Sequence, residues 1–130
     1  MTGHHPPPLL RREMVHVGEI LGQRIRRVRQ AKGYGLRELA RLLKISPTYL
    51  SRVETNEEKR PPGEEVLRHL ARYLDDDFDE LMSLAGRVPK DLKEFIAKDP
   101  GLSRFLRAVR DRRCSAAELR RMLQAWKDEE

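Results

Sequence analysis

Residues 36–54, with the sequence Leu-Arg-Glu-Leu-Ala-Arg-Leu-Leu-Lys-Ile-Ser-Pro-Thr-Tyr-Leu-Ser-Arg-Val-Glu, decide the fold. Apolar residues recur at helical spacing on both sides of Ser46, so two short helices can pack against each other across a turn. Ser46 is a good N-cap and Pro47 suits the first position of a helix. The apolar residues are Leu39, Ala40, Leu43, Leu50 and Val53. The stretch therefore predicts a helix, a tight turn and a second helix.

The second of these helices has a polar face that its neighbour does not need to bury. This face carries Thr48, Ser51 and Arg52. In the major groove of DNA an arginine can make a bidentate contact with guanine, and the methyl group of a threonine can contact thymine. We therefore predict these three residues as base contacts, with Arg52 as the leading one. The alternative is a solvated polar face on a fold that binds protein.

The stretch resembles the helix-turn-helix of phage-repressor and Cro-type transcription regulators, the XRE family. The resemblance covers about half the chain, from about Gly18 to Ala85, and it implies a five-helix, lambda-repressor-like DNA-binding domain. The segments that carry it are the Arg-rich stretch 21–33, Glu-Leu-Ala at 38–40, Ser-Pro-Thr-Tyr-Leu-Ser-Arg-Val-Glu at 46–54, and Leu67-x-x-Leu70-Ala71-x-x-Leu74.

Two positions depart from the family pattern. Lys44 stands where the family usually has glycine, so we expect this residue to adopt a positive φ at some cost. Gly35 and Leu36 stand where the family often has a capping Ser or Thr and a phosphate-binding Gln, so that contact is in doubt. The resemblance also implies an ion pair between Arg29 and Glu54, which would hold the recognition helix against the first helix.

Side chains that flank the recognition helix are candidates for contacts with the DNA backbone. By resemblance, the first helix and the loop after the third helix border the groove. The alternative for each basic side chain is a solvated surface charge, and for Tyr49 it is a ring at the edge of the core. The predicted backbone contacts are Gln23, Arg27, Lys44, Pro47, Tyr49, Lys59 and Arg60.

Charge is segregated along the 130 residues, which carry a formal net charge of +6. Residues 11–60 hold 13 Lys and Arg against 6 Asp and Glu, whereas residues 61–86 hold 2 against 7. Residues 87–130 hold 12 against 8. A mixed solvated surface does not explain this segregation of charge. It is expected of a protein that contacts phosphates with only one face.

The whole chain is predicted to be all-α. We expect helices over about 17–32, 36–43, 47–55, 64–74, 78–85, 89–98 and 100–112, and a last helix that begins at a capping box at Ser115. The domains are then a flexible N-terminal arm (1–16), a helix-turn-helix DNA-binding domain (17–86) and a small C-terminal helical dimerisation unit (87–130).

Three short amphipathic helices within residues 87–130 make a poor core by themselves. They must pack on the first domain, on a second copy of the chain or on another protein. We predict a homodimer, because two recognition helices one turn of DNA apart give specificity on a palindrome. The predicted dimer interface consists of Leu92, Phe95, Phe105, Leu106, Leu123 and Trp126.

We predict a sequence-specific regulator that binds a double-stranded DNA operator and represses its own or a neighbouring operon. Residues 84–95 and 99–102 resemble the tails of repressors from mobile elements and defence islands. Some of these repressors are cleaved by a zinc metallopeptidase encoded nearby, which implies a cleavage site around Ala85 to Lys90. The alternatives are an antitoxin whose C-terminal helices bind a toxin, and a restriction-modification controller.

The sequence does not indicate an enzyme, and we predict no catalytic residues, no metal and no cofactor. The aspartates at 75–79 lack the calcium-loop pattern. The single cysteine, Cys114, rules out an intramolecular disulfide, and its alternatives are a redox switch or an incidental residue. No stretch has membrane-spanning length and no signal peptide is visible, so we expect a cytoplasmic, nucleoid-associated protein encoded by a bacterium or phage. Histidines without metal-ligand spacing relative to Cys114 are His4, His5, His16 and His69.

Overall fold

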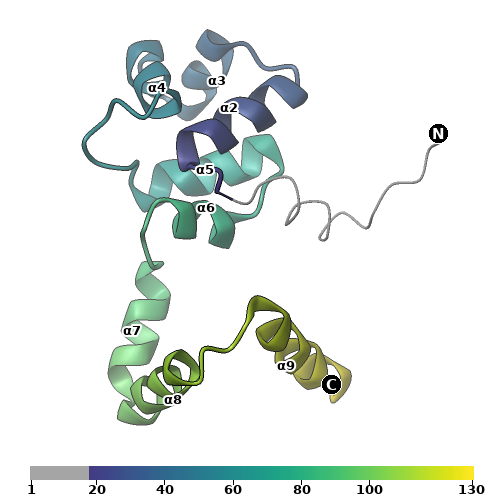
Figure 1. Cartoon of the computed structure of the whole chain (residues 1–130). Coiled ribbons are helices and arrows are strands. Elements are labelled where there is room, and N and C mark those ends of the chain that lie inside the picture. Colours follow the sequence, from purple (N-terminus) through teal and green to yellow (C-terminus); the bar gives the residue numbers. More distant parts are fainter. Residues whose placement is uncertain (1–17) are drawn as a thin grey trace, which may run out of the picture. The chain divides into compact units, whose positions relative to one another are not determined.

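The computed structural model describes residues 18–130, and this part of the chain contains eight α-helices and no strand (Figure 1). The predicted all-α class is confirmed. The predicted arm, residues 1–16, lies outside the described residues. The chain divides into two compact units, the first ending at Pro89 and the second spanning Lys90–Glu130. The helices are α2 (Leu21–Ala31), α3 (Leu36–Leu43), α4 (Pro47–Glu54), α5 (Glu64–Leu74), α6 (Phe78–Leu84), α7 (Lys90–Lys98), α8 (Pro100–Asp111) and α9 (Ala116–Asp128).

The start of the first described helix differs from the predicted one. Helix α2 begins at Leu21, four residues after the predicted start. Gly18 has a φ of 78°, outside the helical region, and Ile20 is extended as the N-cap. The Ile20 N–H donates to Oε1 of Gln23 at 3.0 Å, which satisfies a backbone donor that the helix leaves without a partner. Periodicity alone did not reveal this cap, because the helical spacing of apolar residues continues across it.

The same type of three-residue turn occurs four times, each time between two consecutive helices. Its first residue has a positive φ, and its third residue is the N-cap of the next helix. The N–H of the middle residue donates to a carbonyl five residues earlier, as Ile45 does to Ala40 at 3.0 Å and Cys114 does to Val109 at 3.2 Å. The expected positive φ of Lys44 is confirmed. The first residues of the turns are Gly33 (φ 80°), Lys44 (φ 60°), Asp75 (φ 52°) and Arg113 (φ 53°).

The first unit has a continuous hydrophobic core. Helix α4 packs against α2 and α3, while α5 packs against α6 and α3. Gly22 marks the close approach of α2 to the end of α4, because a Cβ at this position would lie 2.4 Å from the Val53 carbonyl oxygen. The largest fully buried side chains are Ile25, Leu39, Leu50, Leu67, Leu70, Leu74, Leu81 and Met82.

The second unit has no buried residue in any of its three helices. Helices α7 and α8 contact each other, and each of the three helices is amphipathic. The large apolar side chains of this unit stay exposed, as Phe95 (59%) and Trp126 (60%) show. Local helix signals are therefore satisfied in this unit, but its apolar side chains gain little burial from one another.

Candidate nucleic-acid interface

Helix α4 has one buried face and one exposed face. Leu50, Val53 and Glu54 are buried, whereas Thr48 and Arg52 are exposed. Ser51, the third predicted base contact, is partly exposed on α4. The N-terminus of the helix is fixed by its cap. The structure therefore presents short polar side chains and an arginine on a helix that its neighbours hold in place.

The cap and the turn before α4 use the residues that the sequence singled out. The Ser46 hydroxyl oxygen accepts the Tyr49 N–H at 3.0 Å, and Pro47 occupies the first turn, where a missing N–H costs nothing. Tyr49 is partly buried, and burial together with the negative charge of Glu58 raises the pKa of its hydroxyl, against a smaller opposite effect of Arg87. The ring therefore lies at the edge of the core with a neutral hydroxyl.

A buried ion pair joins α2 to the end of α4. Arg29 Nε donates to Oε2 of Glu54 at 2.7 Å, and Nη2 donates to Oε1 at 2.9 Å. Arg29 Nη1 also donates to the Tyr34 carbonyl oxygen at 3.0 Å, so the same side chain contacts the turn before α3. The hydrogen bond that Arg29 donates to Glu54 raises the pKa of Arg29 against the effect of burial, so the guanidinium stays charged. The structure thus brings together the two residues that the family resemblance pairs.

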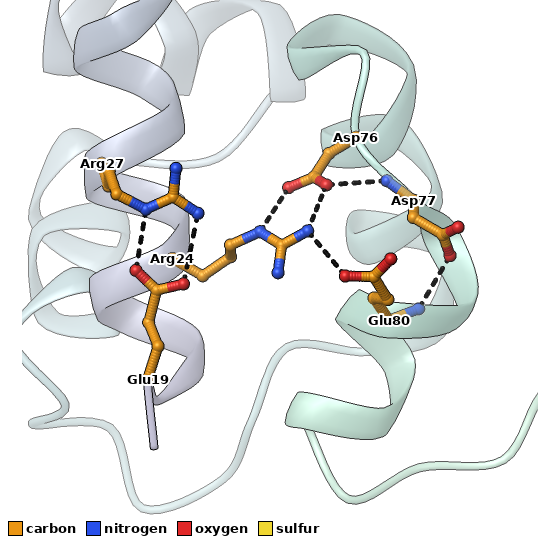
Figure 2. Close-up of polar contacts among 6 residues, drawn as sticks. All are labelled: Glu19, Arg24, Arg27, Asp76, Asp77 and Glu80. Atoms are coloured by element: carbon orange, nitrogen blue, oxygen red, sulfur yellow. Dashed lines mark hydrogen bonds and ion pairs between the residues drawn. The ribbon is translucent and has the colours of Figure 1, made fainter. Parts of the chain in front are cut away.

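A second buried cluster was not predicted from the sequence. Arg24 lies between α2 and the α5–α6 turn, where Nη2 donates to Asp76 at 2.6 Å and to Glu80 at 3.0 Å (Figure 2). Burial acts to lower the pKa of Arg24, but the hydrogen bonds and negative charges of Asp76 and Glu80 raise it overall. Asp77 caps α6 beside this cluster, because its Oδ1 accepts the Glu80 N–H at 2.9 Å.

The only local sign of this cluster is the position of Arg24 on the buried face of α2, beside Leu21 and Ile25. Its partner Asp76 is 52 residues away in the sequence. An arginine on an apolar helix face either pairs with a buried acidic side chain or extends its guanidinium to solvent. No local spacing in the sequence distinguishes these two cases. The cluster joins α2 to the α5–α6 turn, and α2 in turn packs against α4.

Several predicted backbone contacts already have partners within the protein. Arg27 is bonded to Glu19 through two hydrogen bonds of 2.9 and 3.2 Å (Figure 2), and Gln23 caps α2. Arg52, which is 59% exposed at its side chain, lies 3.6 Å from a carboxylate oxygen of Glu58. Surface ion pairs of this kind are weak, so Arg52, a predicted base contact, can exchange this carboxylate for another acceptor.

Three other predicted backbone contacts have no such partner. Lys44, Lys59 and Arg60 are exposed, and none has a hydrogen bond or ion pair through its side chain within residues 18–130. Lys44 lies in the turn before α4, and the other two lie in the loop after it. Their charges therefore flank α4 on both sides along the chain.

The loop after α4 is held by Arg87, which was not among the predicted site residues. Arg87 Nε donates to the carbonyl oxygen of Pro62 at 2.8 Å, and Nη2 donates to that of Pro61 at 2.9 Å. Prolines supply carbonyl acceptors but no N–H, so an external donor suits this segment. A cavity of about 270 Å³ lies beside the loop, between the start of α2 and the end of α6.

The six residues of the predicted dimer interface all lie in α7, α8 and α9, and all are exposed. Within residues 18–130, no group of three or more His, Cys, Asp and Glu side chains comes together in a way that could hold a metal ion. No helix in the same range is both long enough and apolar enough to span a membrane.

Residues 22–87 match the family described as a helix-turn-helix domain. None of the curated protein sequences matches the chain. Among solved structures, the chain is similar to SinR of Bacillus subtilis, the master regulator for biofilm formation, in complex with DNA (35% identity, 48% of this chain and 98% of that chain, TM-score 0.45). It is also similar to a SinR–SinI protein complex (26% identity, 85% of this chain and 100% of that chain, TM-score 0.47). A third similar structure is the clp gene regulator ClgR of Corynebacterium glutamicum (28% identity, 80% of this chain and 94% of that chain, TM-score 0.45).

Proposed function

Because the chain belongs to the XRE-type helix-turn-helix family, we propose that it is a sequence-specific transcriptional regulator that binds an operator in duplex DNA as a homodimer. The observation that carries this proposal is the orientation of α4. Its apolar face is buried, and its exposed face presents Thr48, Ser51 and Arg52. Side chains of this kind on a supported helix are suited to base edges in the major groove.

Contacts with phosphates would complete this mode of binding. Lys44, Lys59 and Arg60 offer charges at the two ends of α4 that no carboxylate of the described residues neutralises. Phosphate contacts set the orientation of a protein on the duplex, and base contacts set its sequence preference. The acidic residues of α5 and α6 carry the opposite charge, so they favour a single orientation of the domain toward DNA.

Dimerisation through the second unit would be consistent with the same function. The exposed apolar residues of α7, α8 and α9 need a partner surface, and a second copy supplies a matching one. We further propose repression, because a dimer that covers a promoter excludes polymerase without any additional surface.

Binding to the DNA upstream of the protein's own coding sequence tests this function. The full chain is titrated onto that duplex and onto a random duplex of equal length, at about 50 and 200 mM salt. We expect at least about a thousandfold preference for the upstream duplex and a steep loss of affinity with salt. A footprint should show two half-sites about 10 base pairs, or a multiple of that, apart. Equal affinity for the two duplexes would contradict the proposal.

A second candidate function is a protein-binding module such as an antitoxin. The exposed apolar faces of α7, α8 and α9 favour it, because a protein of another sequence can cover them as a second copy can. Sedimentation equilibrium distinguishes the two. A stable homodimer that protects these helices from hydrogen exchange would contradict the antitoxin, whereas a monomer at micromolar concentration would contradict the dimeric regulator.

A further inference from the structure

We propose that the polar face of α8 binds the phosphate backbone of duplex DNA, as a contact additional to those around α4. Arg104, Arg107 and Arg110 recur every three residues and form what we call the arginine stripe. Residues at this spacing lie near one another on a helix surface. The inference rests on the proposed function, because the ligand is the duplex that α4 binds.

The arginine stripe lies on the side of α8 opposite to the apolar residues. At 100° per residue, the three arginines are centred about 150° away from the centre of Leu102, Phe105, Leu106 and Val109, with Arg110 nearest to the apolar side. A second copy that covers the apolar face therefore leaves Arg104 and Arg107 exposed, while Arg110 lies at the border of that face. The same helix can pair two chains with one face and bind phosphates with the other.

Two of the three charges of the stripe have no partner in the described part of the chain. Arg104 and Arg107 are exposed, and neither has a hydrogen bond or ion pair through its side chain in the described part of the chain. Arg110 bonds to the adjacent Asp111 at 3.0 Å, with both side chains largely exposed. By contrast, Arg24 and Arg29 of the first unit are buried and bonded to carboxylates. The stripe therefore offers its charges to an external anion.

The polar faces of α7 and α8 differ in the signs of their charges. Helix α7 mixes Lys90 and Lys93 with Asp91 and Glu94, as is usual for a face that only keeps a helix soluble. Residues 100–127 instead hold eight Lys and Arg against two Asp and Glu. Seven of the eight are arginines, which bind phosphate in a bidentate manner that lysine cannot. This excess of arginine is suited to a surface that binds a polyanion and is not needed for a surface that only faces water.

The dimensions of the stripe fit duplex DNA. Arg104 and Arg110 are separated by about 9 Å along the helix axis, at 1.5 Å per residue. A duplex carries about five phosphate charges over that length. Because α8 is covalently joined to the helix-turn-helix unit, DNA bound by α4 is present near α8 at a high effective concentration. A set of weak contacts can therefore contribute measurably to the affinity.

The test compares two full-chain variants of equal charge. The stripe variant is R104Q/R107Q/R110Q, and the matched control K90Q/K93Q/K98Q removes three charges from α7. The slope of log Kd against log salt is measured on a random duplex and on the upstream duplex. Removal of three phosphate contacts should reduce the slope by about 2.7, so that between 50 and 200 mM salt the stripe variant loses about 40-fold less affinity than the wild type. The control should reduce it by less than about 1.

The preference for the upstream duplex over random DNA should stay unchanged in the stripe variant, because phosphate contacts carry no sequence information. Equal slopes in the two variants, or an unchanged slope in the stripe variant, would overturn the inference. Weaker binding to single-stranded RNA with no change on duplex DNA would overturn it as well. If the triple variant loses helicity by circular dichroism, Arg107→Gln alone should reduce the slope by about 0.9, and no reduction would overturn the inference.

The inference and the proposed function fail in different ways. A wild-type chain with no preference for the upstream duplex contradicts the function, while a slope change in the stripe variant still supports the inference. A clear preference together with identical slopes in both variants contradicts the inference alone.

Discussion

The two units of this chain use the same local devices with different results. Both contain capped amphipathic helices, and both contain the turn in which a left-handed residue precedes the N-cap by two positions, at Lys44 in the first and at Arg113 in the second. The first unit buries a continuous core, whereas α7, α8 and α9 bury nothing fully. Local signals thus specify helices in both units. A core also requires enough facing apolar surfaces, and three short helices do not supply them.

This difference assigns distinct roles to the apolar residues of the two units. In the first unit they stabilise the domain and hold α4 in position. In the second unit they stay exposed and available to a partner. Substitutions of similar chemistry should therefore have different effects in the two units.

Loss of the buried carboxylate should have the largest effect. Glu54→Ala leaves the buried Arg29 without its ion-pair partner, and we expect the free energy of unfolding to fall by about 3–5 kcal/mol. Urea unfolding followed by circular dichroism measures this. Glu94→Ala in α7, which removes an exposed 3.9 Å pair with Lys90, is the control and should cost under about 0.5 kcal/mol. Equal losses in the two variants would refute the assigned difference between the units.

Truncation of apolar residues should separate core from interface. Leu39→Ala removes a fully buried side chain and should cost about 2–5 kcal/mol at any protein concentration. Phe105→Ala should instead shift the monomer–dimer equilibrium and leave the unfolding midpoint of the first unit unchanged. Thermal unfolding at two protein concentrations, with sedimentation equilibrium, measures both. A concentration-independent loss of stability in Phe105→Ala would show that this residue belongs to a core.

A methyl group at the crossing of α2 and α4 should have an intermediate effect. Gly22→Ala places a Cβ 2.4 Å from a backbone oxygen of Val53, so the helices must separate, at a cost of about 1–3 kcal/mol. Gly35→Ala is the matched control, because a Cβ there meets no neighbouring atom within 4 Å and φ is negative. The difference in urea midpoint between the two variants measures the clash, offset by the cost of an alanine at the N-cap of α3 in the control. No difference would mean that the crossing is not tight.

Relief of the left-handed turn should have the smallest effect. Lys44→Gly removes the strain of a positive φ but adds chain entropy to the unfolded state, so we expect a gain of about 0.5–1 kcal/mol. Arg113→Gly relieves the same strain in the second unit and should leave the unfolding midpoint of the first unit unchanged. Differential scanning calorimetry of the two variants compares them directly. Destabilisation by Lys44→Gly would contradict the assigned turn geometry.

Much of the fold was predictable because its determinants are local. Ser46, Pro47 and the apolar spacing on either side specify α3, the turn and α4 within 19 residues. The positive φ of Lys44 was expected from the family resemblance, because the family usually has glycine at this position of the turn. The predicted start of α2 was wrong, because a cap that the Gln23 side chain forms with the backbone does not change the spacing of apolar residues.

The site was less predictable where it depends on distant pairs. The association of Arg29 with Glu54 came from family resemblance, since no local spacing relates residues 25 positions apart. Arg24 with Asp76, and Arg87 with the proline carbonyls, join segments that only the folded chain brings together. Which exposed side chains of α4 touch bases remains a prediction, because it depends on a ligand that neither sequence periodicity nor packing describes.

The affinity of Arg52→Ala for operator and random DNA shows whether α4 contacts bases. Its control is Arg60→Ala, a predicted phosphate contact. If α4 contacts bases through Arg52, the first variant should lose about 1–3 kcal/mol on the operator, mainly at one base position, and little on random DNA. Arg60→Ala should weaken both duplexes alike and reduce the salt slope by about 1. Equal losses on both duplexes in Arg52→Ala, or no loss on either, would contradict base contact by α4.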